Sequence, residues 1–102
     1  MITHCQEEIQ DIAPKAFHLG DLVVTRGVDD FLKGNHVALI PLINQHKNGH
    51  WGDCCSEDAV QNNWATHNGQ RILSVYYING EKVWIITEHD RSVTTVLFPS
   101  EY

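Results

Sequence analysis

An Asn-Gly pair at residues 79–80 constrains the fold of this chain more than any other feature. Asn and Gly both tolerate the left-handed backbone that a two-residue hairpin turn requires. The flanking segments, 72–78 and 82–88, are rich in the β-branched and aromatic residues that favour strands. The pair therefore predicts an antiparallel hairpin in which Ile78 lies opposite Glu81.

A second hairpin follows, and polar side chains crowd its turn. The last strand is expected over residues 93–98, with Pro99 after it. A loop of two or four residues gives the same pairing here, so the alternation of the two sheet faces does not depend on the turn type. This register places Arg71 opposite Glu88 as an ion pair and Thr87 beside Thr94.

Helical signals precede the hairpins. Pro41 suits the first turn of a helix over 40–47, and Ser56 is a good N-cap for a helix over 57–67. A short strand is expected at 22–25. We predict one α+β domain in which an antiparallel meander sheet of three or four strands packs against two or three helices. The domain spans 1–102, with an N-terminal arm over 1–17 and the β-meander over 70–99.

Both faces of the predicted sheet are largely apolar, whereas a sheet with one face in water alternates more cleanly. One face should pack against the helices. We expect the N-terminal segment or a second subunit to cover the other, because an exposed apolar face of that size is typical of an interface. A homodimer is the interpretation that we favour.

Composition limits the possible partners and the compartment. The chain has 13 acidic and 7 basic residues, a formal net charge of −6 and no basic stripe, which disfavours a nucleic-acid partner and leaves a protein partner open. No apolar run reaches the roughly 18 residues of a membrane span, and the N-terminus does not resemble a signal peptide. Three cysteines, two of them adjacent, form a poor disulfide framework. We therefore expect a cytoplasmic protein with reduced thiols.

Four segments carry a motif pattern: His46-x-x-Gly49-His50-Trp51-Gly52, Glu57-Asp58-x-x-x-Asn62, Gly69-x-Arg71-Ile72-Leu73-Ser74-x-Tyr76, and Trp84-Ile85-Ile86-Thr87-Glu88-x-Asp90-Arg91-Ser92-x-Thr94-Thr95-x-Leu97-x-Pro99-x-Glu101-Tyr102. The pattern resembles a family of small uncharacterised bacterial proteins that are often encoded on plasmids, phages and other mobile elements. The resemblance covers roughly residues 19–102, and it departs from the family at His50, where Asp is usual. It implies an accessory protein of mobile DNA and no defined reaction.

We therefore favour a small non-enzymatic accessory or binding protein. Its binding edge would involve Trp51, Asp58, Asn62, Arg71, Glu88, Asp90 and Arg91. The alternative is a metal-dependent hydrolase or nuclease in which Asp58, Glu88 and Asp90 supply the carboxylates. A nuclease would normally add a lysine near such acids, and Lys82 is several residues away.

A zinc site is a further alternative. The candidate ligands are His46, His50, Cys54 and Cys55. Structural zinc sites usually combine two separated ligand pairs, and no second pair lies at a standard spacing. We therefore predict neither a metal nor a cofactor.

Overall fold

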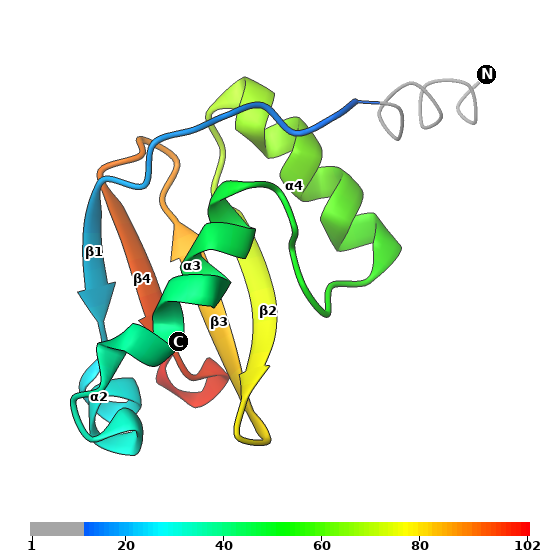
Figure 1. The fold of residues 1–102 in the computed structure, drawn as a ribbon. Helices are drawn as coiled ribbons and strands as arrows, with labels where there is room; N and C mark the ends of the chain where they lie inside the picture. The colour runs from blue at the N-terminus through cyan, green and yellow to red at the C-terminus, as the bar shows by residue number, and fades with distance from the viewer. Residues whose placement is uncertain (1–11) are drawn as a thin grey trace.

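The computed structural model describes residues 12–102 and shows an α+β fold. Its strands are β1 (Asp21–Val24), β2 (Ile72–Ile78), β3 (Glu81–Thr87) and β4 (Val93–Leu97); its helices are α2 (Arg26–Leu32), α3 (Ile40–Lys47) and α4 (Ser56–Asn68), with short 3₁₀ turns η1 (His36–Leu39) and η2 (Pro99–Glu101). Helices α3 and α4 lie on the same side of the sheet (Figure 1). Cys5 and most of the expected N-terminal arm lie outside the described residues.

The four strands form one mixed sheet in the order β1-β4-β3-β2. Strand β1 runs parallel to β4, so the expectation of a fully antiparallel meander is wrong for this strand. Hairpin turns join β2, β3 and β4 and force antiparallel pairing. A long connection that contains α2, α3 and α4 separates β1 from β4, and a connection of that length allows two strands to run in the same direction.

The hairpin registers are confirmed. Asn79 and Gly80 have φ angles of 50° and 83°, and Ile78 pairs with Glu81. In the second hairpin Thr87 pairs with Thr94. Its loop has four residues, 89–92, and is closed by a hydrogen bond of 3.0 Å from the Glu88 amide to the Val93 carbonyl.

The helices begin and end close to their predicted limits. Helix α3 starts at Ile40 with a proline in its first turn. Helix α4 begins at Ser56, and Cys55 rather than Ser56 occupies its N-cap position. Gly69 ends α4 in the left-handed conformation, with φ 64°, as a glycine after a helix commonly does.

The hydrophobic core lies on the helix side of the sheet. One cluster of buried residues comprises Val28, Leu32, Leu39, Tyr76, Val83, Ile85 and Val96, and a smaller one comprises Trp51, Ala65 and Ile72. Ile86 and Leu97, on the opposite face, belong to neither cluster. No helix within residues 12–102 is long and apolar enough to cross a membrane.

The segment at residues 12–20 also packs on the helix side. Phe17 contacts the rings of His46 and Trp51, and the Lys15 amide donates to the Thr66 hydroxyl at 2.8 Å. This part of the arm therefore does not cover the opposite face of the sheet, contrary to one of the two expectations.

Candidate functional site

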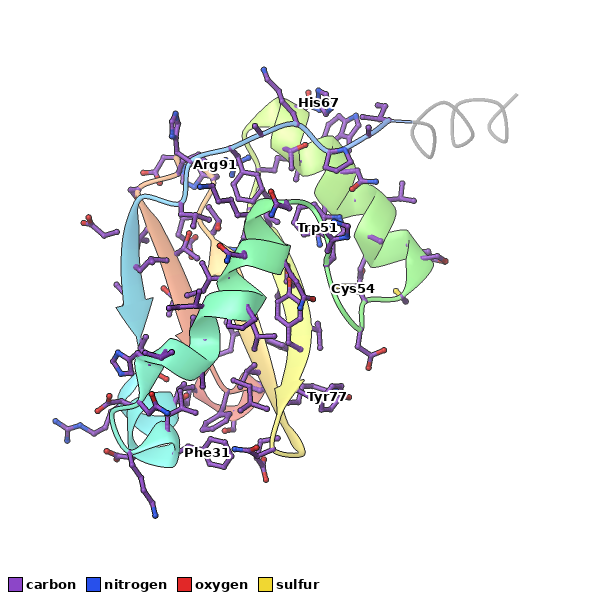
Figure 2. All side chains as sticks on the ribbon, viewed as in Figure 1. Phe31, Trp51, Cys54, His67, Tyr77 and Arg91 are labelled. Atoms are coloured by element: carbon purple, nitrogen blue, oxygen red, sulfur yellow. The ribbon has the colours of Figure 1, made fainter. Side chains whose placement is uncertain are left out.

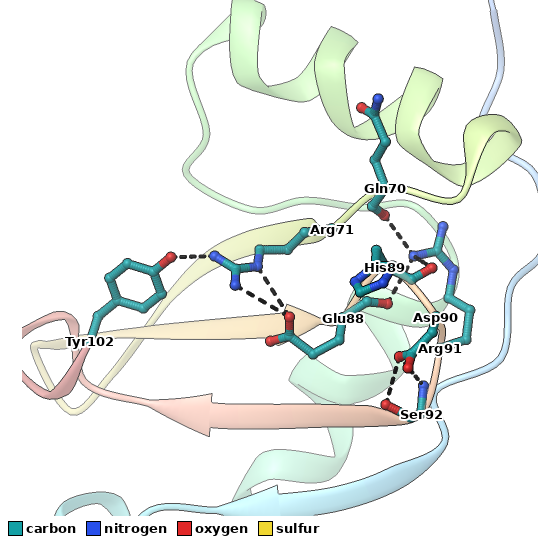
Figure 3. A network of polar contacts seen from close by, with 8 residues as sticks. All are labelled: Gln70, Arg71, Glu88, His89, Asp90, Arg91, Ser92 and Tyr102. Carbon is teal, nitrogen blue, oxygen red and sulfur yellow. Dashed lines mark hydrogen bonds and ion pairs between the residues drawn. The ribbon is translucent and has the colours of Figure 1, made fainter.

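The predicted ion pair lies at the end of the sheet beside the second turn. The guanidinium of Arg71 is 3.3 Å from a carboxylate oxygen of Glu88 and also donates to the Tyr102 hydroxyl (Figure 3). Glu88 raises the pKa of Arg71 further above its ordinary value. Because both charged side chains are partly exposed, the pair contributes less than about 1 kcal/mol to stability and is accessible to a partner.

Arg91 has a different environment from its neighbours in the turn. Its backbone has a φ of 60°. Its guanidinium donates to four backbone carbonyls, those of Gln70 (2.6 Å), Glu88 (3.1 Å), His89 (3.4 Å) and Ala65 (2.9 Å). The Ala65 carbonyl lies in the last turn of α4, where it also accepts from the backbone amides of Gly69 and Gln70. Arg91 therefore joins the end of α4 to the turn, and this side chain is occupied by structural contacts (Figures 2 and 3).

Asp90 stabilises the same turn locally. One carboxylate oxygen accepts hydrogen bonds from the Ser92 amide at 3.1 Å and from the Ser92 hydroxyl at 2.6 Å. These two bonds hold the pKa of Asp90 below its ordinary value. The geometry is that of an Asx turn, which explains an Asp at this position without a ligand.

A chain of buried polar groups runs beneath this end of the sheet, and sequence reasoning missed it. His46 Nδ1 lies 2.5 Å from the Ser74 hydroxyl, and its Nε2 lies 2.8 Å from the Thr87 hydroxyl. Thr87 lies 2.7 Å from the Thr94 hydroxyl, which donates to the Leu19 carbonyl at 2.7 Å.

The Leu19 carbonyl at the end of this network fixes the direction of three of its bonds, because a carbonyl can only accept. Thr94 donates to it, so Thr87 donates to Thr94, and His46 Nε2–H donates to Thr87. When the ring is neutral, Nδ1 carries no proton and accepts from the Ser74 hydroxyl. The neutral ring therefore has a single tautomer, with its proton on Nε2.

The surroundings of His46 agree with this assignment. Its side chain is fully buried and contacts Phe17 and Trp51 edge-on, at ring-centroid distances of 5.5 and 5.8 Å. Burial, followed by the charge of Arg91, lowers the pKa of His46 from 6.5 to about 4. A sequence signal for this role existed, because His46 shares one helical face with Leu39 and Ile43.

Trp51 belongs to a segment that covers the outer edge of β2. Its carbonyl accepts from the Val75 amide at 3.0 Å, and the Asp53 amide donates to the Val75 carbonyl at 2.7 Å. Between them, Gly52 has a φ of 77°, and a Cβ there would lie 1.9 Å from the Val75 carbonyl oxygen. The Trp51 ring is buried and donates to Asn63 at 2.8 Å.

Asn62 extends this cover along the same edge. Its side-chain amide donates to the Leu73 carbonyl at 2.7 Å and accepts from the Leu73 amide at 3.1 Å, so it replaces a neighbouring strand. Asn62 is buried, while Val60 and Trp64 of the same helix remain partly exposed. The apolar stripe of α4 is therefore not its most buried face, and the polar face that includes Asn62 packs against the sheet.

The three carboxylates of the hydrolase alternative lie on separate elements. Asp58 is exposed in the first turn of α4, Glu88 faces Arg71, and Asp90 binds Ser92. Within residues 12–102, no group of three or more His, Cys, Asp or Glu residues is arranged to hold a metal ion. Burial, followed by the charge of Asp58, raises the pKa of the Cys54 thiol, which disfavours the reactive thiolate form.

The end of the motif pattern has a structural role that the sequence did not reveal. The Glu101 carboxylate accepts from the Thr25 hydroxyl at 2.7 Å, from the Gly27 amide at 3.2 Å and from the Phe98 amide at 2.9 Å. It therefore caps the start of α2 and fixes η2 to it. Tyr102 packs edge-on against Trp84 at 5.6 Å between ring centroids.

The sheet face opposite the helices carries accessible apolar side chains near the predicted residues. Its partly or fully exposed members are Val23, Leu73, Val75, Tyr77, Trp84 and Val93. Tyr77 is 51% exposed and extends outward beyond β2 (Figure 2). The Arg71–Glu88 pair borders this surface, which we call the open face. Of the seven predicted binding residues, only these two lie there.

Comparisons of the chain with family models, with curated proteins and with solved structures found no match.

Proposed function

We propose that this chain is a small non-enzymatic accessory protein that binds another protein through the open face of its sheet. The observation that carries the proposal is the exposure of apolar side chains on this face: Leu73, Val75 and Trp84 are partly exposed, and Tyr77 is 51% exposed. Partly exposed apolar groups with a polar border are typical of protein-binding surfaces. An origin on mobile DNA rests on the sequence resemblance alone.

The chemistry of the remaining candidates supports binding over catalysis. Trp51, Asn62 and Arg91 are each occupied by hydrogen bonds to the fold. His46, the one fully buried histidine of residues 12–102, lies in a network of satisfied hydrogen bonds that solvent does not reach. On the open face, the Arg71–Glu88 pair is accessible beside a tyrosine and aliphatic side chains. This combination suits recognition of a partner that presents both apolar and charged groups.

The test is quantitative co-purification from a bacterial lysate with cross-linking to map contacts. The double variant Tyr77→Ala/Glu88→Ala removes two accessible groups of the open face. Asn44→Ala is the matched control, because Asn44 is exposed on α3, on the helix side. We expect wild type and control to retain the same protein, with cross-links to the open face, and the double variant to lose it.

Equal retention by all three chains would refute the proposal, as would cross-links confined to the helix side. A rise in melting temperature on adding Mn²⁺ or Zn²⁺ that disappears in Glu88→Ala would favour the hydrolase alternative instead. The double variant is suitable because each group is partly exposed, so its removal should change the free energy of unfolding by less than about 1 kcal/mol.

A further inference from the structure

The two edges of the sheet differ in how their backbone groups are satisfied. At the β2 edge, the outward amides and carbonyls of Leu73 and Val75 are all paired, with Asn62 and with the Trp51–Asp53 segment. Proteins generally protect edge strands in this way, because unpaired strand edges recruit other chains. The opposite edge, formed by β1, has no such cover within the described chain (Figure 1).

The pairing of β1 with β4 shows which backbone amides and carbonyls of β1 have no hydrogen-bond partner among the described residues. Asp21 and Thr25 donate to β4, to the carbonyls of Ser92 and Val96 at 3.0 and 3.1 Å. Backbone groups alternate in direction along a strand, so the amides and carbonyls of Leu22 and Val24 point away from β4. No residue between 12 and 102 supplies a hydrogen-bond partner for those outward groups.

The side chains of β1 add to the exposed edge. Leu22 is 52% and Val23 43% exposed, on opposite faces of the strand. The strand has no proline, no lysine and no bulge, which are the usual means of blocking a further strand. An aliphatic strand with free backbone groups is complementary to another strand of the same kind.

We propose that β1 is the dimerisation edge of this protein: two copies pair antiparallel through β1 and join their sheets into one continuous sheet. With Val23 on the two-fold axis, Leu22 lies opposite Val24 of the partner subunit, and the outward groups of both residues are satisfied in both copies. The two Val23 side chains then contact each other on the open face.

Charge complementarity favours a second copy as the occupant. Asp21 begins the strand and Arg26 follows its end, and neither has an ion-pair partner between residues 12 and 102. The antiparallel arrangement brings the acidic start of one strand beside the basic end of the other, at both ends of the pair. It also keeps the two Asp21 carboxylates apart, on opposite sides of the two-fold axis.

Edge pairing covers only the Val23 end of the open face and joins two such faces side by side, so the dimer is independent of the proposed function. The two proposals can also fail separately: a monomer could still bind a partner protein through the open face, and a dimer could lack such a partner protein.

The first test is sedimentation equilibrium of the full chain over a range of concentrations. We expect a monomer–dimer equilibrium. Val23→Lys places two like charges together at the axis and should raise the dimer Kd by about tenfold or more. Leu22→Pro removes only an outward amide and should also dissociate the dimer without unfolding the domain. Tyr77→Lys, on the open face at the far edge, is the charge-matched control and should leave Kd unchanged.

The second test is amide hydrogen exchange measured residue by residue. The amides of Leu22 and Val24 should be protected only at concentrations where the dimer forms, while the Val23 amide, which faces β4, should be protected at every concentration. A chain that stays monomeric overturns the proposal. So does a dimer in which Leu22 and Val24 exchange freely, or one that Tyr77→Lys dissociates and Leu22→Pro does not.

Discussion

Acidification should destabilise this protein through His46. The folded state holds this ring neutral, with a pKa of about 4, whereas an unfolded chain restores the ordinary value of 6.5. Between these two values the unfolded state binds more protons, so the free energy of unfolding rises with pH across this window. The contribution is fully present above pH 6.5 and is lost as the pH falls toward 4.

The structure gives both the size and the cause of the effect. Protonation would put a hydrogen on Nδ1, which already accepts the Ser74 hydroxyl at 2.5 Å, so the bond could not persist with its present direction. At about 1.4 kcal/mol per pKa unit, the difference between the two states amounts to about 3 kcal/mol in full and about 2 kcal/mol by pH 5.

The assay is urea unfolding at several pH values between 7.5 and 4.5, followed by circular dichroism. His46→Gln is the matched control, because a glutamine amide can donate to Thr87 and accept from Ser74 without titrating. We expect wild type to lose about 2 kcal/mol more than this variant between pH 7.5 and pH 5. Carboxylates such as Glu101, whose pKa is lowered chiefly by the Phe98 amide, titrate in both chains and cancel.

An equal pH dependence of the free energy of unfolding in wild type and His46→Gln would refute the reasoning. So would an NMR titration that places the His46 pKa near 6.5, or nitrogen shifts that assign the proton to Nδ1 in the folded protein.

Further substitutions test the other structural assignments. Arg91→Lys should lower the free energy of unfolding by about 1–3 kcal/mol, measured in urea, because an ammonium cannot reach all four carbonyls. Asn62→Leu should cost about 2–3 kcal/mol by leaving the Leu73 backbone unpaired, and should speed hydrogen exchange at the Leu73 amide. Glu101→Gln should weaken the cap of α2 and cost about 1 kcal/mol in a thermal melt. Arg71→Ala should change stability by less than about 1 kcal/mol, and a larger loss would contradict its assignment to an accessible pair.

The hairpins were predictable because their signals are local. Asn79-Gly80 sets the first turn, and the side-chain period of two carries the register through to Thr94. The ion pair of Arg71 with Glu88 followed from that counting and is confirmed. Helix α3 was also predictable, because Pro41 marks its first turn.

The structural features that the sequence did not predict depend on contacts between distant segments. The parallel pairing of β1 with β4 leaves no local mark, because no turn joins the two strands. Asn62 pairs with the backbone of β2 in place of a neighbouring strand. Ranking the faces of α4 by apolarity does not identify this role, because Asn62 is polar. The hydrogen-bond network of His46 includes residues of three strands and of the N-terminal segment. The only sign of its burial in the sequence was therefore its position on the apolar side of α3.

The parallel pairing of β1 with β4 also governs the order of events during synthesis. Strand β1 leaves the ribosome before α2, α3 and α4, whereas β4, its neighbour in the described sheet, is made after all three. Until β4 is made, Leu22 and Val23 have no partner strand among the described elements. Pairings between such distant segments form slowly, and unpaired apolar strands are prone to association during that interval. The nascent chain therefore has a defined vulnerable period, in which chaperone binding should concentrate on the segment that later becomes the edge of the sheet.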